Sequence, residues 1–133
     1  MQIVDKTALF MAAVIVALLP HQLWASETET MVTSWYGPGM QCYPQPDGSC
    51  VELMANGQPF NMDDPTVAAH KDLPFGTRLR VTNPETGDTI VVAVQDRGPF
   101  IPGRDLDLSR GAARAIGMIE LGVAELEVEI LAD

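Results

Sequence analysis

The chain consists largely of short segments with the two-residue periodicity of β-strands, and this feature most limits what it can fold into. Residues Val123 to Leu131 give the clearest case, since small and apolar residues alternate there with three glutamates. Alternation of this kind predicts a strand with one face in the core and the other in solvent. The glutamates are therefore interpreted as a solvated face and not as a metal site.

Similar segments recur along the chain. Strands are expected at residues 31–36, 67–70, 78–82, 89–94, 105–108 and 123–131, and Ser109 and Gly117 fit the start and stop of one short helix over 110–116. Residues 26–30 are expected to form a mobile tail, and Cys42 to Gly57 a loop. Because strands and helices do not alternate regularly, the sequence predicts the all-β class and a small closed barrel.

The first 25 residues have the pattern of an export signal. Thr7 to Leu19 is apolar and uncharged, follows Lys6, and precedes a segment that ends in the small residue Ala25. A stretch of this length is short for a membrane-spanning helix. We predict a signal peptide over 1–25 and a single domain over 26–133, with no stable membrane anchor after cleavage. An uncleaved anchor is the alternative.

The charge and the two cysteines agree with an exported protein that does not bind nucleic acid. The formal net charge is −10, from 18 acidic and 8 basic residues, which disfavours nucleic acid and anionic lipid surfaces as partners. Cys42 and Cys50 are eight positions apart, with two prolines and a glycine between them. In an oxidising compartment this spacing predicts a disulfide and not a zinc site.

The chemistry is expected where an apolar run ends in a charged turn. Ile90 to Val94 is short and rich in β-branched residues, which predicts a strand buried on both faces. Alternation would carry Asp96 onto the face of Val92 and Val94, at the edge of the core, where partial burial suits a carboxyl to acid–base chemistry. A Gly-Pro turn follows at once. A turn residue bonded to its own backbone is the alternative role for Asp96.

Other kinds of chemistry find little support. His70 is the one imidazole beyond the predicted signal and has no cluster of ligands around it, so no metal is expected. Ser34 and Ser109 lack the surroundings of a nucleophilic serine. Carboxylate chemistry by Asp96 remains, with His70 as a supporting partner; a purely structural histidine is the alternative. No cofactor is expected.

Several motifs cover most of the predicted domain: Ser34–Gly37, Ala55–Gly57, Ala68–Thr77, Asp96–Phe100 and Asp107–Ser109. Together they resemble the rare lipoprotein A family. The resemblance implies a six-stranded double-psi β-barrel, shared more distantly with expansins. It also implies a lytic transglycosylase of the bacterial periplasm or cell envelope, whose partner is the glycan strand of peptidoglycan. The bond between N-acetylmuramic acid and N-acetylglucosamine would be cleaved to give a 1,6-anhydro end.

The resemblance also assigns roles within the site. It implies that Asp96 is the general acid and base and that His70 is its catalytic partner. Trp35, Tyr36, Gln58 and Arg97 are candidate sugar contacts, although Trp35 and Tyr36 would equally suit the core. The family pattern has a glutamate where this chain has Gln58. Because an amide cannot transfer a proton, the alternative function is a catalytically silent glycan-binding or expansin-like wall-loosening module.

Overall fold

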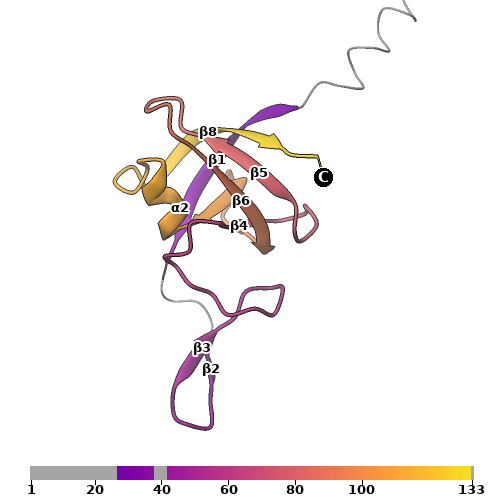
Figure 1. The fold of residues 1–133 in the computed structure, drawn as a ribbon, viewed down its shortest axis with the longest axis vertical. Coiled ribbons are helices and arrows are strands. Elements are labelled where there is room, and N and C mark those ends of the chain that lie inside the picture. The colour runs from indigo at the N-terminus through magenta and orange to yellow at the C-terminus, as the bar shows by residue number, and fades with distance from the viewer. Residues whose placement is uncertain (1–26, 38–41, 133) are drawn as a thin grey trace, which may run out of the picture.

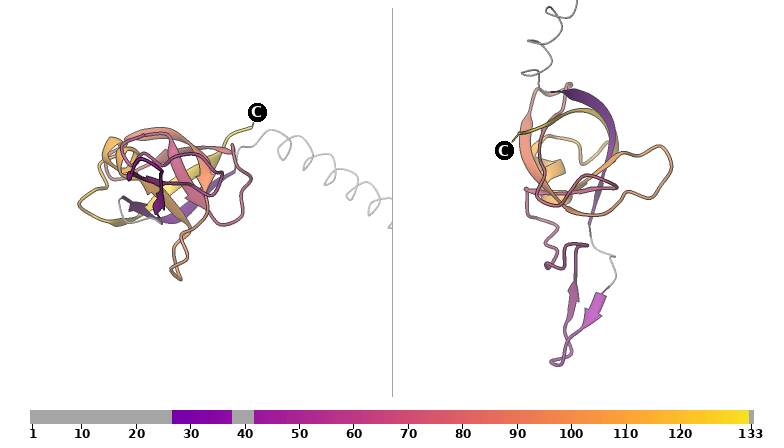
Figure 2. Two further views of the ribbon diagram at one scale, coloured as in Figure 1. Left: turned by 90° about the horizontal axis from the view of Figure 1, so that it is seen from below. Right: turned by 90° about the vertical axis from the view of Figure 1, so that its right-hand side faces the viewer.

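Six strands close into a barrel, as predicted. A computed structural model of the chain describes residues 27–37 and 42–132. The barrel strands are β1 (Thr28–Tyr36), β4 (Val67–His70), β5 (Arg78–Thr82), β6 (Thr89–Asp96), β7 (Leu106–Ser109) and β8 (Val123–Ile130). They follow one another around the barrel in the order β1-β7-β4-β6-β5-β8. Figures 1 and 2 show how these strands enclose the barrel. The pairs β1–β7 and β4–β6 are parallel and the other neighbours antiparallel, so the barrel is mixed.

Alternating apolar residues fill the interior, as the sequence indicates. Leu79 and Val81 of β5 are fully buried, as are Leu126 and Val128 of β8. The predicted burial of both faces of β6 is wrong, because Val91 is 40% exposed while its neighbour Val92 is buried. The described residues include a single short helix, which forms no layer over the outside of this strand, so its second face meets solvent at Val91.

One helix, α2 (Arg110–Ala115), follows β7 and covers part of the core. Ser109 is its N-cap, as predicted, and its Oγ accepts a hydrogen bond from the amide of Ala112 at 3.1 Å. Gly117 lies just beyond the helix with φ of 72°, a conformation that glycine adopts without steric cost. The helix lies against the loop over residues 61–65, because the amide of Gly111 donates to the carbonyl of Met62 at 2.8 Å.

The structure corrects the expected N-terminal tail. β1 begins at Thr28, within the segment expected to be mobile, and pairs with β8 from Thr28 opposite Glu129 onward. Residues 28–30 are exposed on both strand faces, so no hydrophobic pattern marks them in the sequence. Main-chain pairing to β8 holds them instead.

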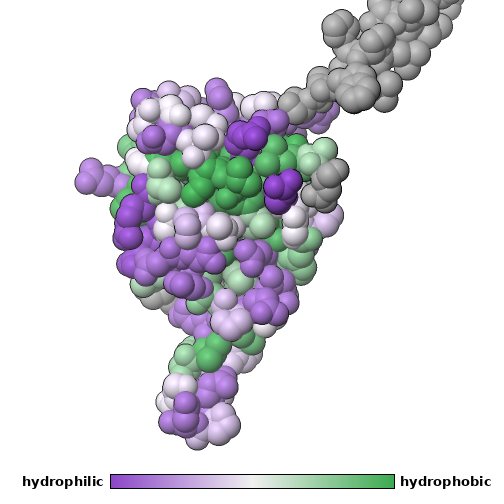
Figure 3. All heavy atoms as spheres, viewed as in Figure 1, coloured by the Kyte–Doolittle hydropathy of each residue, from purple (hydrophilic) through white to green (hydrophobic). Residues whose placement is uncertain are grey.

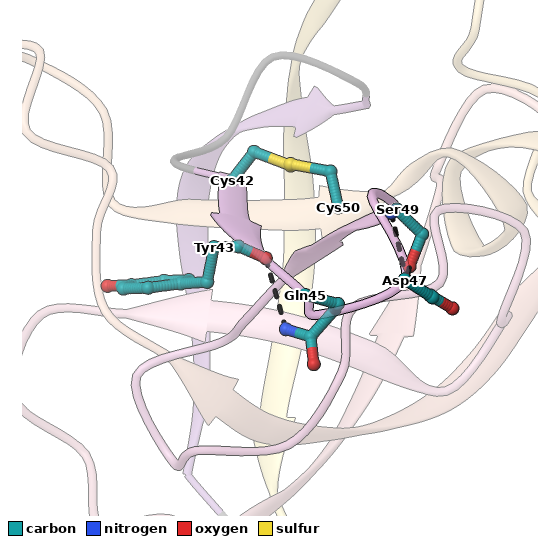
Figure 4. Close-up of a disulfide and its surroundings, with 6 residues drawn as sticks. All are labelled: Cys42, Tyr43, Gln45, Asp47, Ser49 and Cys50. Carbon is teal, nitrogen blue, oxygen red and sulfur yellow. Dashed lines mark hydrogen bonds between the residues drawn. A yellow bond between two sulfur atoms is a disulfide. The ribbon is translucent and has the colours of Figure 1, made fainter.

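The structure also corrects the expected loop over Cys42 to Gly57, since two short strands, β2 (Cys42–Pro44) and β3 (Cys50–Glu52), form an antiparallel hairpin there. The Cys42–Cys50 disulfide closes it, with 5.6 Å between the Cα atoms (Figure 4). This hairpin, called the arm below, projects away from the barrel (Figures 1 and 2). Its surface is mostly hydrophilic, whereas apolar side chains gather on the barrel face seen in the same view (Figure 3).

The described part of the chain contains no helix suited to a membrane. Among residues 27–37 and 42–132, none is long and apolar enough to cross one. The predicted signal peptide over 1–25 lies outside the described residues.

Candidate active site

A cavity of about 370 Å³ opens on the side of the barrel. Strands β1, β4, β6 and β7 contribute to its wall, and the segment after β6 forms one rim. The residues that line it are Ser34, Trp35, Tyr36, Ala69, Asp96, Arg97, Gly98, Pro99, Phe100, Ile101, Arg104 and Asp107. Two carboxyl groups, those of Asp96 and Asp107, thus share one concave surface with aromatic and apolar side chains.

A β-bulge determines which way Asp96 points. Ala68 pairs with Val94, but Ala69 pairs with Asp96, so β6 carries one extra residue at Gln95. Directly paired residues present their side chains on the same side of a sheet. Ala68 belongs to the core and Ala69 lines the cavity, so Asp96 faces the cavity side. The sequence prediction that Asp96 continues the face of Val94 is therefore wrong, because the bulge shifts the alternation by one residue.

Asp96 is buried and accepts three hydrogen bonds. Its exposed fraction is 7%. Oδ1 accepts from the amides of Ala55 at 2.8 Å and Arg97 at 2.9 Å, and Oδ2 accepts from the Tyr36 hydroxyl at 3.3 Å. The turn that supplies Ala55 lies over the end of β6, because the amide of Asn56 donates to the carbonyl of Gln95 at 3.2 Å. These donors come from three separate segments and fix the orientation of the carboxyl group.

Asp107 is a second carboxyl that sequence reasoning did not assign to the site. It follows Leu106 on β7, and its Oδ1 accepts a hydrogen bond from Ser34 Oγ at 3.0 Å. Burial raises the pKa of Asp107 to about 6; the Ser34 hydrogen bond and the charge of Arg104 oppose this shift, and the charge of Asp96 adds to it. One signal was available in the sequence: Asp107 lies between two apolar residues of a strand, inside a motif shared with the family.

The two adjacent aromatic residues of β1 lie differently. The Tyr36 ring stacks on Phe60, with 4.7 Å between ring centroids. Burial, followed by the charges of Asp96 and Asp107, raises the pKa of Tyr36, so its phenol stays protonated and can donate. The Trp35 indole donates to the carbonyl of Ile119 at 3.2 Å and packs against the core, although Trp35 also lines the cavity.

His70 does not meet Asp96 directly. His70 follows Ala69 on β4, so strand alternation directs the side chains of His70 and Ala69 to opposite faces. Because Asp96 lies on the same side as Ala69, His70 lies on the other side. The Nδ1 of His70 accepts hydrogen bonds from the backbone amides of Asp72 at 3.0 Å and Leu73 at 3.1 Å. In the neutral ring the proton therefore lies on Nε2. Burial lowers the pKa of His70. Both residues are described, and no hydrogen bond joins them.

Arg97 organises the turn that carries His70. Its Nη1 donates to the carbonyl of His70 at 3.2 Å and to that of Leu73 at 2.8 Å. The guanidinium also lies over the Phe75 ring, 4.0 Å from the centroid. Arg97 lines the cavity, and these two hydrogen bonds use its Nη1 donors.

Gln58 lies at the edge of the site. It is exposed and belongs to the turn that supplies Ala55, since the Met54 amide donates to its carbonyl at 2.8 Å and its own amide donates to Asn56 Oδ1 at 3.0 Å. Its side chain does not line the cavity. Within the part of the chain that the structure describes, no group of three metal-ligating side chains occurs.

The fold and site define a double-psi β-barrel protein with a carboxyl-containing cavity on the side of its barrel, and comparison with known proteins gives the family. Residues 28–128 match the family described as "Lytic transglycolase", and the chain belongs to this family.

Curated relatives carry matching names. The chain is 45% identical over 118 residues to a protein from Nostoc sp. named "Probable endolytic peptidoglycan transglycosylase RlpA". The aligned region covers 87% of this chain and 30% of the Nostoc protein. It is 39% identical over 112 residues to the "Endolytic peptidoglycan transglycosylase RlpA" of Campylobacter jejuni, covering 84% of this chain and 37% of the other. The chain thus spans about a third of the length of these relatives.

Solved structures share the barrel. An expansin from Clavibacter michiganensis aligns with a TM-score of 0.59 at 25% identity, covering 80% of this chain and 52% of the expansin. The Streptomyces papain inhibitor aligns with a TM-score of 0.58 at 18% identity, covering 80% of this chain and 96% of the inhibitor. The second likeness concerns the fold alone.

Proposed function

We propose that this domain is a peptidoglycan lytic transglycosylase. It would cleave the bond between N-acetylmuramic acid and N-acetylglucosamine and leave a 1,6-anhydro-muramic end. The observation that carries the proposal is a buried, firmly oriented carboxyl, Asp96, in the wall of an open cavity on the barrel of a family described as lytic transglycolases. The names of the relatives support the substrate.

The proposed reaction consumes no water. The glycosidic oxygen is protonated as its bond to C1 of the muramic sugar breaks, and the C6 hydroxyl of the same sugar attacks C1 and loses its proton. We assign this acid–base chemistry to Asp96. The amides of Ala55 and Arg97 hold its Oδ1, and the Tyr36 hydroxyl reaches Oδ2, so the carboxyl enters the reaction already oriented.

The remaining predicted residues receive the following roles. His70 is proposed as the catalytic partner of Asp96 on the strength of the family resemblance; it lies outside the cavity lining, and Nε2–H is the donor it can offer, because its Nδ1 is occupied. Arg97 and Tyr36 line the cavity and are proposed as sugar contacts, together with Trp35 at the cavity wall and Gln58 at the outer edge. No cofactor is assigned.

The proposed location is the bacterial periplasm or cell envelope, where peptidoglycan lies. We assign residues 1–25 to a cleaved signal peptide and residues 26–133 to the catalytic domain. Intact mass measurement on protein recovered from the envelope tests this assignment. A mature chain beginning at Ser26 is expected, and a chain that keeps Met1 would contradict it.

A second candidate function is a catalytically silent glycan-binding or wall-loosening module. The likeness to an expansin favours it, together with the amide of Gln58 at the family's glutamate position. Both candidates require binding to peptidoglycan, but only the transglycosylase releases anhydro ends. The products therefore separate the two.

The test uses residues 26–133 with purified peptidoglycan, both intact and stripped of its stem peptides, and mass spectrometry of the products. Anhydro-muramic ends are expected from the wild type and should be lost in Asp96→Asn with an unchanged thermal midpoint. Asp88→Asn is the control, because it removes one exposed carboxylate outside the cavity. Binding without product would favour the silent module, and full activity of Asp96→Asn would exclude the assigned role.

A further inference from the structure

Asp96 and Asp107 flank a single alanine across three neighbouring strands. Ala69 of β4 pairs with Asp96 on β6 and with Asp107 on β7. Neighbouring strands lie about 4.8 Å apart, so the two aspartate Cα atoms are on the order of 9–10 Å apart on one side of the sheet. In carboxyl pairs that cleave glycosidic bonds, the carboxyl groups themselves are separated by roughly 5–9.5 Å, and two aspartates with this Cα spacing can reach such a separation. A sugar residue over Ala69 would have a carboxyl on either side.

The contacts of Asp107 leave one of its oxygens available. Oδ1 accepts from Ser34, and Oδ2 accepts no hydrogen bond from residues 27–37 or 42–132. Over the described residues, every fully buried side-chain oxygen or nitrogen has a hydrogen-bond partner. Oδ2 is therefore reachable from outside, and Asp107 lines the cavity. By contrast, Oδ1 of Asp96 already accepts two amides and Oδ2 a phenol.

The surroundings of Asp107 favour its protonated form more than those of an ordinary aspartate do. Its pKa is raised to about 6, chiefly by burial. The charged and titratable groups that share its cavity are Asp96 from β6, Tyr36 from β1, Arg104 from the segment before β7 and Arg97 from the segment after β6. Strand β4 contributes the uncharged Ala69. A carboxyl whose pKa approaches the working pH is an efficient proton donor. Two carboxyls in different environments suit separate acid and base roles.

We propose that Asp107 is a second catalytic carboxyl, which donates the proton to the glycosidic oxygen while Asp96 accepts the proton of the C6 hydroxyl. This refinement rests on the proposed function and divides the acid and base roles between two residues. The C1–O bond breaks as Asp107 delivers its proton, and the C6 oxygen bonds to C1 as Asp96 takes the hydroxyl proton. The leaving oxygen keeps the proton of Asp107, and Asp96 holds the proton of the C6 hydroxyl. Exchange with solvent then restores both groups.

Ser34 gives a way to tell a catalytic carboxyl from a merely structural one. Its hydroxyl donates to Asp107 Oδ1 and thereby stabilises the ionised form. Removing the hydroxyl in Ser34→Ala should raise the pH at which Asp107 loses its proton. If Asp107 is the donor, the alkaline limb of the activity profile moves to higher pH. A structural carboxyl would leave that limb in place.

The experiment measures initial rates of anhydro-end formation between pH 4.5 and 8.5 for wild type, Asp107→Asn, Ser34→Ala and the control Asp88→Asn. General acid catalysis contributes about 10²–10⁴-fold, so Asp107→Asn should lose at least about 100-fold in kcat while still binding sacculi. Wild-type activity should fall above a pH near 6, and Ser34→Ala should shift this fall upward.

Three results would overturn the proposal. The first is Asp107→Asn activity within about threefold of wild type, and the second is an alkaline limb that does not move in Ser34→Ala. Either one, with an active wild type, rejects the role of Asp107 and leaves the proposed function intact. The third is a folded wild type that binds sacculi and forms no anhydro ends, which rejects both together. Because Ser34→Ala keeps the carboxyl, it tests the role of Asp107 even if Asp107→Asn fails to fold.

Discussion

Asp107→Asn should make the protein more stable at neutral pH and leave its stability nearly unchanged at pH 4. Burial raises the pKa of Asp107 from its ordinary value of 3.8 to about 6. Between these values the folded state binds a proton more tightly than the unfolded state, so the free energy of unfolding falls as pH rises. An asparagine does not ionise, so the free energy of unfolding of the variant does not fall with pH at this position. Its side-chain carbonyl can still accept the hydrogen bond from Ser34.

The size of the effect follows from the same two values. A pKa difference of this size corresponds to about 3 kcal/mol at a pH above both values. Asp107 is partly exposed, so solvent screening reduces the expected gain to about 1–2 kcal/mol. For a domain of this size, about 1 kcal/mol shifts the thermal midpoint by roughly 4–8 °C. The gain should be complete above pH 7 and should disappear progressively as the pH is lowered from about 6 to 4.

Urea unfolding followed by tryptophan fluorescence between pH 4 and 8 checks this prediction. The difference between Asp107→Asn and wild type should grow with pH, while Asp88→Asn should show a small difference that does not. A variant that is less stable than wild type at pH 7.5 would refute the reasoning. So would a gain of equal size at pH 4, because it could not come from ionisation.

Two further predictions concern the parts that support the site. Gly111→Ala should destabilise the protein by about 1–3 kcal/mol, because a Cβ at this position would overlap the carbonyl of Asp63. The loss should appear as a lower midpoint of urea unfolding, and a variant as stable as wild type would contradict this packing. Replacing Cys42 and Cys50 together by serine should raise the rate of amide hydrogen exchange in the arm. Exchange in β5 and β8 should stay unchanged, because the arm projects from the barrel. Faster exchange in those two strands would show that the arm stabilises the core.

The barrel was predictable where each strand has one apolar and one polar face. Residues 123–131 and 78–82 alternate clearly, and both form strands close to the expected limits. The segments that escaped prediction are polar on both sides. Residues 28–30 and the two arm strands bury no apolar face, and main-chain pairing or a disulfide holds them instead. Hydrophobic periodicity cannot reveal such strands.

Part of the site escaped prediction for a different reason. Asp96 was found from its position at the end of an apolar run, but its direction depends on an extra residue at Gln95 that alters the register with β4. Asp107 was recognised only as part of a motif. Its place opposite Ala69 results from pairing between β4 and β7, which are far apart in sequence. Strand register across a barrel is a tertiary property, and a shift of one residue moves a side chain to the other face.

The neighbours Ala68 and Ala69 allow a direct test of which face of β4 packs in the core and which lines the cavity. Both are buried, but Ala68 packs in the core whereas Ala69 lines the cavity between the two carboxyls. Ala68→Val should overpack the barrel and lower the free energy of unfolding by about 1–3 kcal/mol. Ala69→Val should cost less, because its added methyl groups enter the cavity, but they should obstruct a sugar over Ala69. We therefore expect Ala69→Val to bind sacculi weakly and release few anhydro ends while keeping a nearly normal urea midpoint. If Ala69→Val instead unfolds as readily as Ala68→Val and keeps its binding per folded molecule, then Ala69 belongs to the core and the two carboxyls do not face a common substrate.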